Sequence, residues 1–161
     1  MWATVADLGR WAEGSGEIEG MINAGELENV APSEAHAQRL LAEAERHLLS
    51  ADQVADTDPP MAYDSLYSAA RKALAAVLAK QGLRATSRGG HLAAQRAIEA
   101  QLGRVRHVVK AFNHLRITRN EADYPSEQSP PLTPADVRED LPAAADIVDA
   151  MTKLVPRVGP F

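Results

Sequence analysis

The chain has 161 residues, 45% of them hydrophobic and 24% charged, with a formal net charge of −5. These values are ordinary for a soluble protein with one core, and the lack of Cys excludes disulfides, thiolate metal sites and thiol nucleophiles. No stretch approaches the roughly 20 apolar residues of a membrane span, so we expect a soluble cytoplasmic protein without a membrane partner.

Residues 1–32 are rich in Gly, and we expect an N-terminal arm with short helical turns there. A helical-bundle domain is expected over residues 33–156, where helical periodicity dominates and no strand alternation is convincing. Ser33 is a helix N-cap signal. Apolar residues at helical spacing then predict a helix that ends at about residue 55.

The sequence Asp58-Pro59-Pro60 marks a second helix start, because Asp is a good N-cap and Pro is compatible with the first helical turn. The pattern predicts a helix over residues 61–80 that stops at Gly82. A shorter helix is predicted over residues 91–102.

Gly103 then breaks the chain before a long helix predicted over residues 104–124. Thr133-Pro-Ala-Asp136 is another capped start, of a final helix that runs to about Leu154, and Pro142 is expected to kink or split this helix. Together these elements predict an all-α fold, an antiparallel (up-and-down) bundle of four to five helices.

Charge is distributed unevenly along the chain. Residues 71–119 contain 11 of the 17 Lys and Arg residues and only one acidic residue, Glu99, whereas residues 1–70 contain 13 acidic and 3 basic residues. A strongly basic middle is typical of a protein with a polyanionic partner. The alternative is that acidic and basic helices neutralise each other inside one bundle.

The helix predicted over residues 104–124 carries charges where its pattern calls for apolar residues. Its apolar side, made by Val105, Val108, Phe112 and Leu115, continues into Arg116, Arg119 and Asp123. Buried charge is costly unless it is paired, so such a face indicates a site, a subunit interface, or both. The alternative is that the helix end extends into solvent. Residues four apart, Arg119 with Asp123 and Arg116 with Asn120, can pair along the helix.

The run Arg119-Asn120-Glu121-Ala122-Asp123-Tyr124, late in a long helix, resembles the motif of the HEPN (higher eukaryotes and prokaryotes nucleotide-binding) superfamily. The segment 62–73 and the loop with Gly89-Gly90-His91 are also typical of that superfamily. The resemblance covers about residues 34–154 and leaves the N-terminal arm outside the shared fold.

The resemblance implies a bundle that forms a homodimer through its motif helices. Many relatives are metal-independent endoribonucleases of toxin–antitoxin, defence or RNA-processing systems. Their motif is an Arg, usually followed by a polar residue, with a His after four to six intervening positions. Arg119 matches the Arg and Asn120 its polar neighbour, while Tyr124 stands at the first position for the His. Because the chain has no His after His114, the motif His is absent.

RNA cleavage without a metal requires an activated 2′-hydroxyl, stabilised phosphorane charge and a protonated leaving oxygen. Arg119 suits the second task, because a guanidinium can hold two phosphate oxygens at once. A His suits the proton transfers. Tyr124, with an ordinary pKa of about 10, is a poor base, although it can act as an acid or hydrogen-bond donor. The predicted catalytic residues are therefore Arg119, Asn120 and Tyr124.

His91 follows two glycines at a helix start, where backbone N–H groups can bind a phosphate. It is a candidate for the missing imidazole, or else a capping or surface residue. Arg84 and Arg88 of the same loop are either phosphate contacts or solvated charges. Together with Arg116 and Asp123, these three residues make up the predicted nucleotide- or RNA-binding set. No metal or other cofactor is expected.

Two hypotheses about function remain open. In the first, the chain is an RNA-cleaving dimer with a composite site formed by Arg119 and Asn120 of both subunits. In the second, it is a non-catalytic module that binds RNA, a nucleotide, or a protein partner such as a cognate nucleotidyltransferase or antitoxin. The absent motif His favours the second, and the basic middle fits both.

Overall fold

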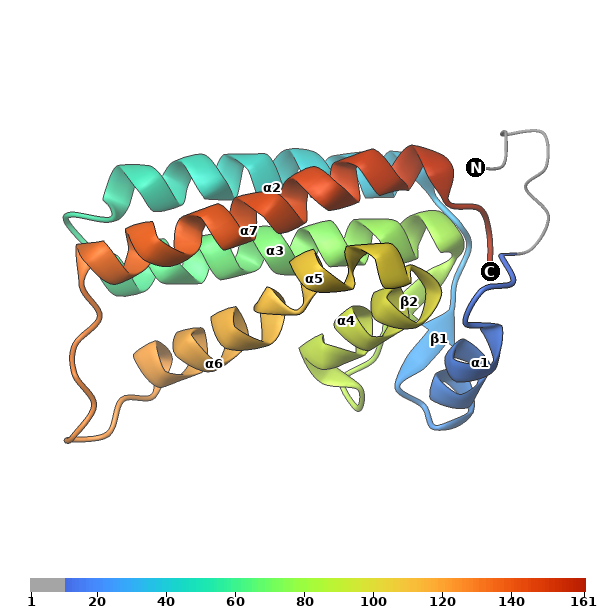
Figure 1. Ribbon diagram of the computed structural model, residues 1–161, viewed down its shortest axis with the longest axis horizontal. Helices are drawn as coiled ribbons and strands as arrows, with labels where there is room; N and C mark the ends of the chain where they lie inside the picture. The colour runs from blue at the N-terminus through green and yellow to red at the C-terminus, as the bar shows by residue number, and fades with distance from the viewer. Residues whose placement is uncertain (1–10) are drawn as a thin grey trace.

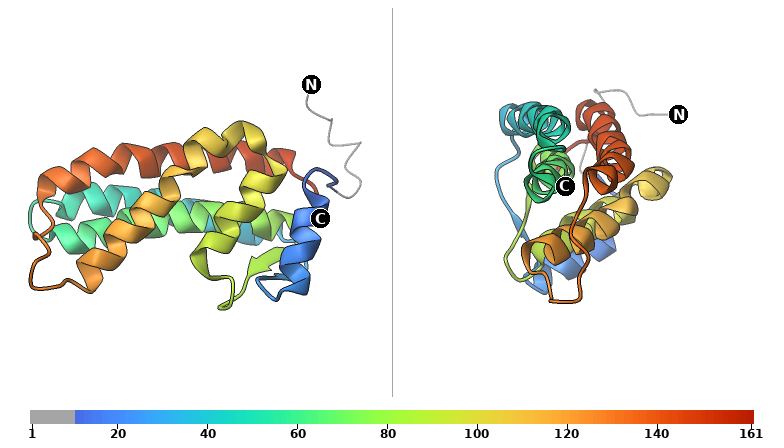
Figure 2. Two further views of the ribbon diagram at one scale, coloured as in Figure 1. Left: turned by 60° about the horizontal axis from the view of Figure 1, so that its bottom comes forward. Right: turned by 90° about the vertical axis from the view of Figure 1, so that its left-hand side faces the viewer.

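Three long helices form the centre of the computed structural model, which describes residues 11–161. They are α2 (Glu34–Val54), α3 (Pro59–Gln81) and α7 (Pro134–Leu154), and α3 contacts both of the others. The end-on view in Figure 2 shows them gathered in one bundle. The first ten residues of the expected N-terminal arm lie outside the described part.

The starts of these helices are those that the sequence predicts. Ser33 accepts a hydrogen bond from the backbone N–H of His36 at 3.1 Å, and Asp58 caps α3 in the same way. Thr133 and Asp136 form a reciprocal capping box at the start of α7. These caps satisfy backbone donors that a helix start leaves unpaired.

Gly82 and Pro142 are the two sequence signals for where helices stop or bend. Gly82 ends α3 with φ of 80°, a conformation that favours glycine. Pro142 lies inside α7 without splitting it. The side chain of Pro142 is exposed, while Val137 and Ala144 on either side of it are buried. Packing of both halves against the bundle therefore keeps the helix continuous.

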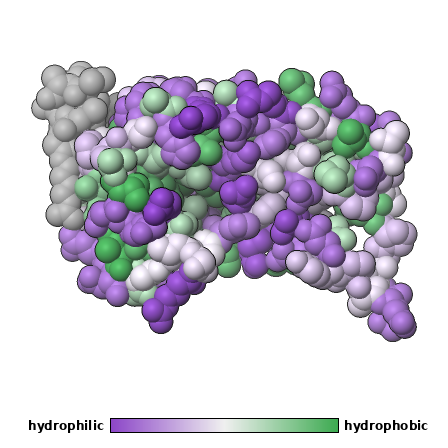
Figure 3. Space-filling view, turned by 180° about the vertical axis from the view of Figure 1, so that it is seen from behind, coloured by the Kyte–Doolittle hydropathy of each residue, from purple (hydrophilic) through white to green (hydrophobic). Residues whose placement is uncertain are grey.

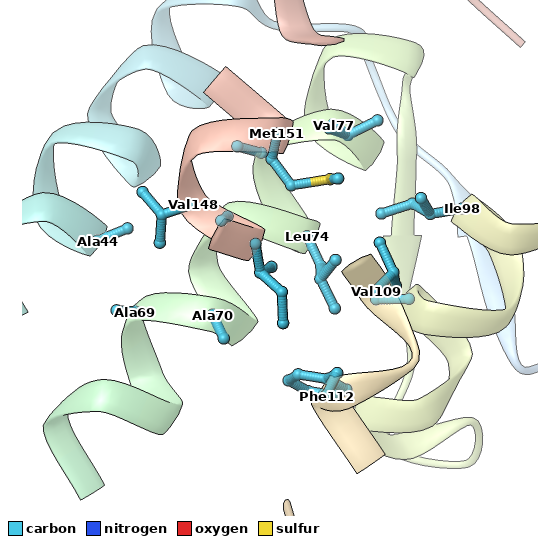
Figure 4. Packing of buried hydrophobic residues seen from close by; sticks show 14 of the residues in the cluster. Ala44, Ala69, Ala70, Leu74, Val77, Ile98, Val109, Phe112, Val148 and Met151 are labelled. Carbon is cyan, nitrogen blue, oxygen red and sulfur yellow. The ribbon is translucent and has the colours of Figure 1, made fainter. Parts of the chain in front are cut away.

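The third long helix predicted by the sequence is broken into three pieces. A 3₁₀ turn (Gly103–Val105) precedes α5 (Arg106–Val109), and α6 (Ala111–Asp123) follows after Lys110. The prediction of one helix over residues 104–124 is therefore wrong. At the break the buried face shifts, so that Val109 rather than Val108 is fully buried, and Val109 lies beside Ile98 of α4 (Gly90–Gln101) (Figure 4).

Successive long segments run in opposite directions along the molecule. Figure 1 shows the chain reversing from α2 to α3, from α3 to the α5–α6 segment, and again to α7. Within the bundle, α6 contacts both α3 and α7. The predicted all-α, antiparallel bundle is confirmed.

A two-stranded sheet joins the N-terminal segment to the end of α3. Strand β1 (Leu27–Asn29) pairs antiparallel with β2 (Leu83–Ala85), with Leu27 opposite Ala85. Three-residue strands are too short to produce a recognisable alternation, so no strand is predicted there from the sequence. The preceding helix α1 (Ser15–Asn23) buries Ile18 and Met21 and contacts α4 (Gly90–Gln101).

Alanine supplies much of the helix–helix contact in the core. Ala44, Ala69 and Ala70 lie where helices face one another, next to larger residues such as Leu74 and Met151 (Figure 4). Small side chains let helix backbones approach closely, while the larger ones fill the remaining space. This packing fixes the position of α3, which carries one side of the candidate site.

The surface seen from behind is mostly polar, with apolar groups scattered over it, and its lower edge is indented between two projecting ends (Figure 3). Scattered apolar residues are ordinary on a protein surface. None of the helices in residues 11–161 is long and apolar enough to cross a membrane.

Candidate functional site

Arg119 is held against α3 by two carboxylates. Its Nε donates to Asp64 Oδ1 of α3 at 2.8 Å and lies 3.0 Å from Asp123 Oδ2, one turn further along α6. The predicted pair of Arg119 with Asp123 is confirmed. The Arg119 side chain is 29% exposed, so the alternative in which this helix end simply extends into solvent does not apply to it. Its hydrogen bond to Asp64 and the charges of both carboxylates raise the pKa of the guanidinium.

A buried tyrosine connects Arg119 to His91. The Cζ atom of Arg119 lies 5.6 Å from the ring centroid of Tyr67, within the range of a cation–π contact. The Tyr67 ring also stacks on Phe112 at 5.4 Å. The Tyr67 hydroxyl is hydrogen-bonded to Nδ1 of His91, at the start of α4. Residues from α3, α4 and α6 thus meet at one place.

Two further arginines act on the same pair. Burial lowers the pKa of His91, and the positive charges of Arg71, Arg119 and Arg116 lower it further. Burial raises the pKa of Tyr67 to about 12, although the same three arginines oppose the shift. We call Arg71, Arg116 and Arg119, together with the Tyr67–His91 pair, the arginine cluster. At neutral pH its imidazole is predominantly neutral and its tyrosine is protonated.

Many basic residues outside the arginine cluster lose their positive charge to ion pairs within the fold, as Arg119 does in part to Asp64 and Asp123. Lys72 pairs with Glu43, and Lys80 with Glu34. Ion pairs also join Arg84 to Glu28 and Arg96 to Glu26. Part of the basic middle is therefore neutralised inside the fold by acidic residues of the N-terminal half.

Arg71 and Arg116 differ from those paired residues. Within residues 11–161, no carboxylate lies within ion-pair distance of either guanidinium. The Nε and one terminal nitrogen of Arg116 donate to Asn113 Oδ1, at 3.2 and 3.0 Å. The expected pairing of Arg116 with Asn120 is therefore wrong, because the amide one turn earlier takes its place.

The other predicted site residues lie at various distances from the cluster. Asn120 is half-buried on α6 next to Arg119, whereas Tyr124 ends the helix with 82% of its surface exposed. Arg84 is on β2, and Arg88 is exposed in the loop that leads to α4. The structure brings Arg116, Arg119, Asp123 and His91 to the cluster.

Sequence reasoning missed Asp64 and Arg71 as members of the site. With Tyr67 they occupy positions i, i+3 and i+7 of α3, which places all three on one face of that helix. That spacing could have shown from the sequence that the three side chains share a face. What the sequence lacked was any indication that this face of α3 lies opposite α6, about 50 residues later in the chain.

Two pockets border the helices that carry this region. One, of about 700 Å³, is bordered by α2, α3, β2 and α4, and its lining includes Arg71, Arg84 and His91. The other, of about 1140 Å³, lies between α6 and the start of α7, and carboxylates of Glu121, Asp136, Glu139 and Asp140 are on its lining residues. Within residues 11–161, no group of three or more His, Asp or Glu side chains is arranged to hold a metal ion.

Comparison with known proteins gives one match. A family model described as "HEPN domain" matches residues 37–154, which spans α2 through α7 and so includes every member of the arginine cluster. No similar curated protein and no similar solved structure was found.

Proposed function

Because this chain belongs to the HEPN domain family, we propose that it binds the phosphate backbone of single-stranded RNA at the arginine cluster and cleaves the RNA there without a metal. The observation that carries the proposal is the convergence of three arginines on a neutral imidazole at a partly exposed site. Such a group of cations attracts a phosphodiester. A neutral imidazole can accept a proton from a hydroxyl of that ligand.

Each residue has a task in this proposal. His91 accepts the proton of the 2′-hydroxyl, whose oxygen attacks phosphorus, and the bond to the 5′ oxygen breaks. The products are a 2′,3′-cyclic phosphate and, once the 5′ oxygen has taken a proton, a 5′-hydroxyl. The arginines stabilise the charge that builds on phosphorus oxygens in between. Tyr67 orients the imidazole: if it accepts a hydrogen bond from Nδ1–H, the Nε2 lone pair is free to act as base.

The carboxylates around Arg119 do not prevent this role. Both the Asp64 and the Asp123 contacts are made by Nε of the guanidinium. The proposal assigns its two terminal nitrogens to the phosphate, since an arginine can present several donors at once. Asp64 and Asp123 then serve to fix the plane of the guanidinium before substrate arrives.

A homodimer is part of the proposal. On α6, Ile117 is an exposed apolar residue and Tyr124 is the exposed residue at its end. Packing of two copies through this helix would cover both and bring two arginine clusters close together. In such a composite site, Tyr124 is the proposed proton donor to the 5′ oxygen, and Asn120 a hydrogen-bond donor to phosphate.

The test is cleavage of total and transfer RNA by purified protein in EDTA. The wild type is compared with Arg119→Ala and His91→Ala, and His107→Ala, an exposed residue of α5, serves as the matched control. We expect fragments with 2′,3′-cyclic phosphate ends, reduced by about 10²-fold or more in the two site variants. Folded, dimeric protein that leaves RNA intact would contradict the catalytic part of the proposal.

A second candidate function is supported by the absence of the motif His. The chain would then be a non-catalytic module that holds RNA or a nucleotide at the arginine cluster and acts with a cognate nucleotidyltransferase or antitoxin. In that case RNA binding depends on Arg119, but no cleavage is seen with the wild type. A toxin–antitoxin role for either form requires growth arrest on expression that a co-expressed partner relieves.

A further inference from the structure

We propose that the pocket of about 700 Å³ beside the arginine cluster is a subsite for one nucleoside of the bound RNA chain. This inference rests on the proposed function, because it assigns the neighbouring phosphate to the arginine cluster. It adds a place where the protein distinguishes one base from another. We call this pocket, bordered by α2, α3, β2 and α4, the nucleoside pocket.

The size and floor of the nucleoside pocket suit a base and its ribose. Its volume falls within the range of about 300–1,000 Å³ that is usual for small-molecule sites. Apolar side chains from three elements line it: Leu40, Ala75, Leu78 and Leu83. The flat, apolar face of a base is stabilised when it leaves water for such a surface.

The charges around the nucleoside pocket suit an anionic ligand. The two charged residues that line it are basic: Arg71 has no ion pair within residues 11–161, and Arg84 is paired with Glu28. Two histidines, His36 and His91, also line the pocket. The pocket between α6 and the start of α7 has four acidic lining residues and no Lys or Arg. The contrast indicates that the basic lining is a property of this pocket and not of the surface as a whole.

The nucleoside pocket is continuous with the arginine cluster. Arg71 and His91 line the pocket and also act on the Tyr67 hydroxyl. A nucleotide with its base on the apolar floor therefore has its phosphate next to these two residues. Two separate binding sites would not share both side chains.

Polar groups at the rim can read the base. The hydroxyl of Thr86 already donates to the backbone oxygen of Gly25, and Nδ1 of His36 lies 3.4 Å from a terminal nitrogen of Arg39. We assign contacts with the base to the hydroxyl of Ser87 and to Nε2 of His36. A base can reach them only when it is unstacked and unpaired. Recognition of splayed bases is the usual route to sequence preference on single-stranded RNA.

The experiment follows the His91 ring signal by NMR during titration with nucleoside 3′-monophosphates, one base at a time, or with inorganic phosphate. We expect at least one nucleotide to bind about tenfold more tightly than inorganic phosphate, which lacks a base. Ala75→Leu fills the pocket and should remove this advantage while leaving phosphate binding intact. Ala42→Leu, an exposed alanine on α2 away from the pocket, is the matched control and should behave as wild type.

A second variant keeps the subsite testable if Ala75→Leu does not fold. His36→Leu changes an exposed rim residue and should reduce the difference among the four bases severalfold. Equal affinities for nucleotide and phosphate in the wild type, or unchanged base preference in folded Ala75→Leu, would overturn the subsite.

The outcomes also separate the subsite from the proposed function. If phosphate binds at His91 but no base improves it, only the subsite fails. If nucleotides bind with base preference but single-stranded RNA oligomers do not compete, the subsite stands as a pocket for free nucleotides and the RNA function fails. Competition by single-stranded but not by duplex RNA is the result that supports both.

Discussion

The guanidinium of Arg119 lies at the edge of the core, and its neighbours hold it in one orientation. Its Nε contacts both Asp64 and Asp123, and its Cζ lies over the ring of Tyr67. A guanidinium constrained in this way loses little conformational freedom when it binds a phosphate. The two acidic neighbours are therefore expected to support catalysis even though their charge opposes RNA binding.

The substitution Asp64→Asn tests this positioning role. It removes one negative charge and weakens the bond that orients Arg119, while it preserves the size of the side chain. We expect RNA to bind as tightly as to wild type or up to about threefold more tightly, while the single-turnover cleavage rate falls about tenfold. Glu139→Gln, an exposed residue of α7, controls for the change in net charge. A fall in affinity together with an unchanged rate would contradict the assignment.

The pKa of His91 gives a second prediction. Because burial and three arginines lower it, His91 should titrate below the usual value of about 6.5, and Arg116→Ala should raise it toward that value. NMR titration of the His91 ring C2–H in the wild type and in Arg116→Ala measures both. A value above the usual one in the free wild type would contradict the geometry of the cluster.

The sign of the pH dependence follows from the same shift. The unfolded chain, with the ordinary pKa, takes up the His91 proton before the folded protein does. The contribution of His91 to stability is therefore complete above about pH 6.5 and is lost as pH falls through and below that value. Cleavage should decline over the same acidic range, because the proposed base becomes protonated.

At this scale the sequence allowed part of the site to be predicted. The pairing of Arg119 with Asp123 followed from helical spacing alone. Asp64 was missed because it is 55 positions away from Arg119 along the chain, and no local rule fixes which face of α3 meets α6. The predicted hydrogen-bond partner of Arg116 was wrong, because Asn113 and Asn120 both lie about one turn from it and helical spacing does not distinguish them.

Among the elements, α4 matters most for the site because it carries His91. Its far end is tied to α3 by two buried amides, Gln81 and Gln101, each of which donates to the other, at 2.7 and 3.1 Å. Gln101 also donates to the backbone oxygen of Ala97. This reciprocal pair fixes α4 at the end opposite to the Tyr67–His91 contact.

Replacement of one of these two amides should lower the free energy of unfolding more than replacement of both. Gln81→Leu leaves the Gln101 amide with an unmet acceptor, and we expect unfolding in urea to require about 1–3 kcal/mol less free energy than in wild type. The double variant Gln81→Leu with Gln101→Leu should recover at least half of that loss. Additive losses in this double-mutant cycle would mean that the two amides do not depend on each other.

Element boundaries were predictable where local chemistry sets them. Ser33, Asp58 and Thr133 begin their helices as caps, and Gly82 ends α3 through its positive φ. The break at Lys110 has no such signal, because neither Gly nor Pro is present there and tertiary packing of Val109 decides it. The strands β1 and β2 are short and join segments far apart in the sequence, so no local pattern reveals them.

For the whole molecule, the proposed dimer makes a prediction about exposed apolar residues. Ile117→Glu adds a charge to the outer face of α6, where Ile117 is 43% exposed. We expect this variant to be a folded monomer in light scattering and to lose cleavage activity, because a buried unpaired charge opposes association. Leu49→Glu, at a residue of α2 that is 65% exposed, should stay dimeric. A dimeric Ile117→Glu protein would exclude this face.

The uneven distribution of charge along the chain is explained in part by how distant segments pack. The interpretation by internal neutralisation holds in part, because Lys72, Lys80, Arg84 and Arg96 pair with acidic residues of the first half. The interpretation by a polyanionic partner stays a prediction, and it depends on Arg71 and Arg116, which have no ion pair within residues 11–161, and on Arg119. The all-α class and the bundle were predictable from periodicity and caps. The packing of distant segments decides which basic residues remain unpaired and can bind a ligand. This packing cannot be predicted from the sequence alone.

The measurement that tests the central claim most directly is the binding of a single-stranded RNA oligomer at several salt concentrations. Wild type is compared with Arg71→Ala, Arg116→Ala and Arg119→Ala, and with Arg138→Ala as control, since Arg138 pairs with Asp56 away from the cluster. We predict that each cluster variant binds more weakly and that its slope of log affinity against log salt falls by about 1, while the control keeps the wild-type slope. Equal losses in all four variants, or none, would show that RNA does not bind at the arginine cluster.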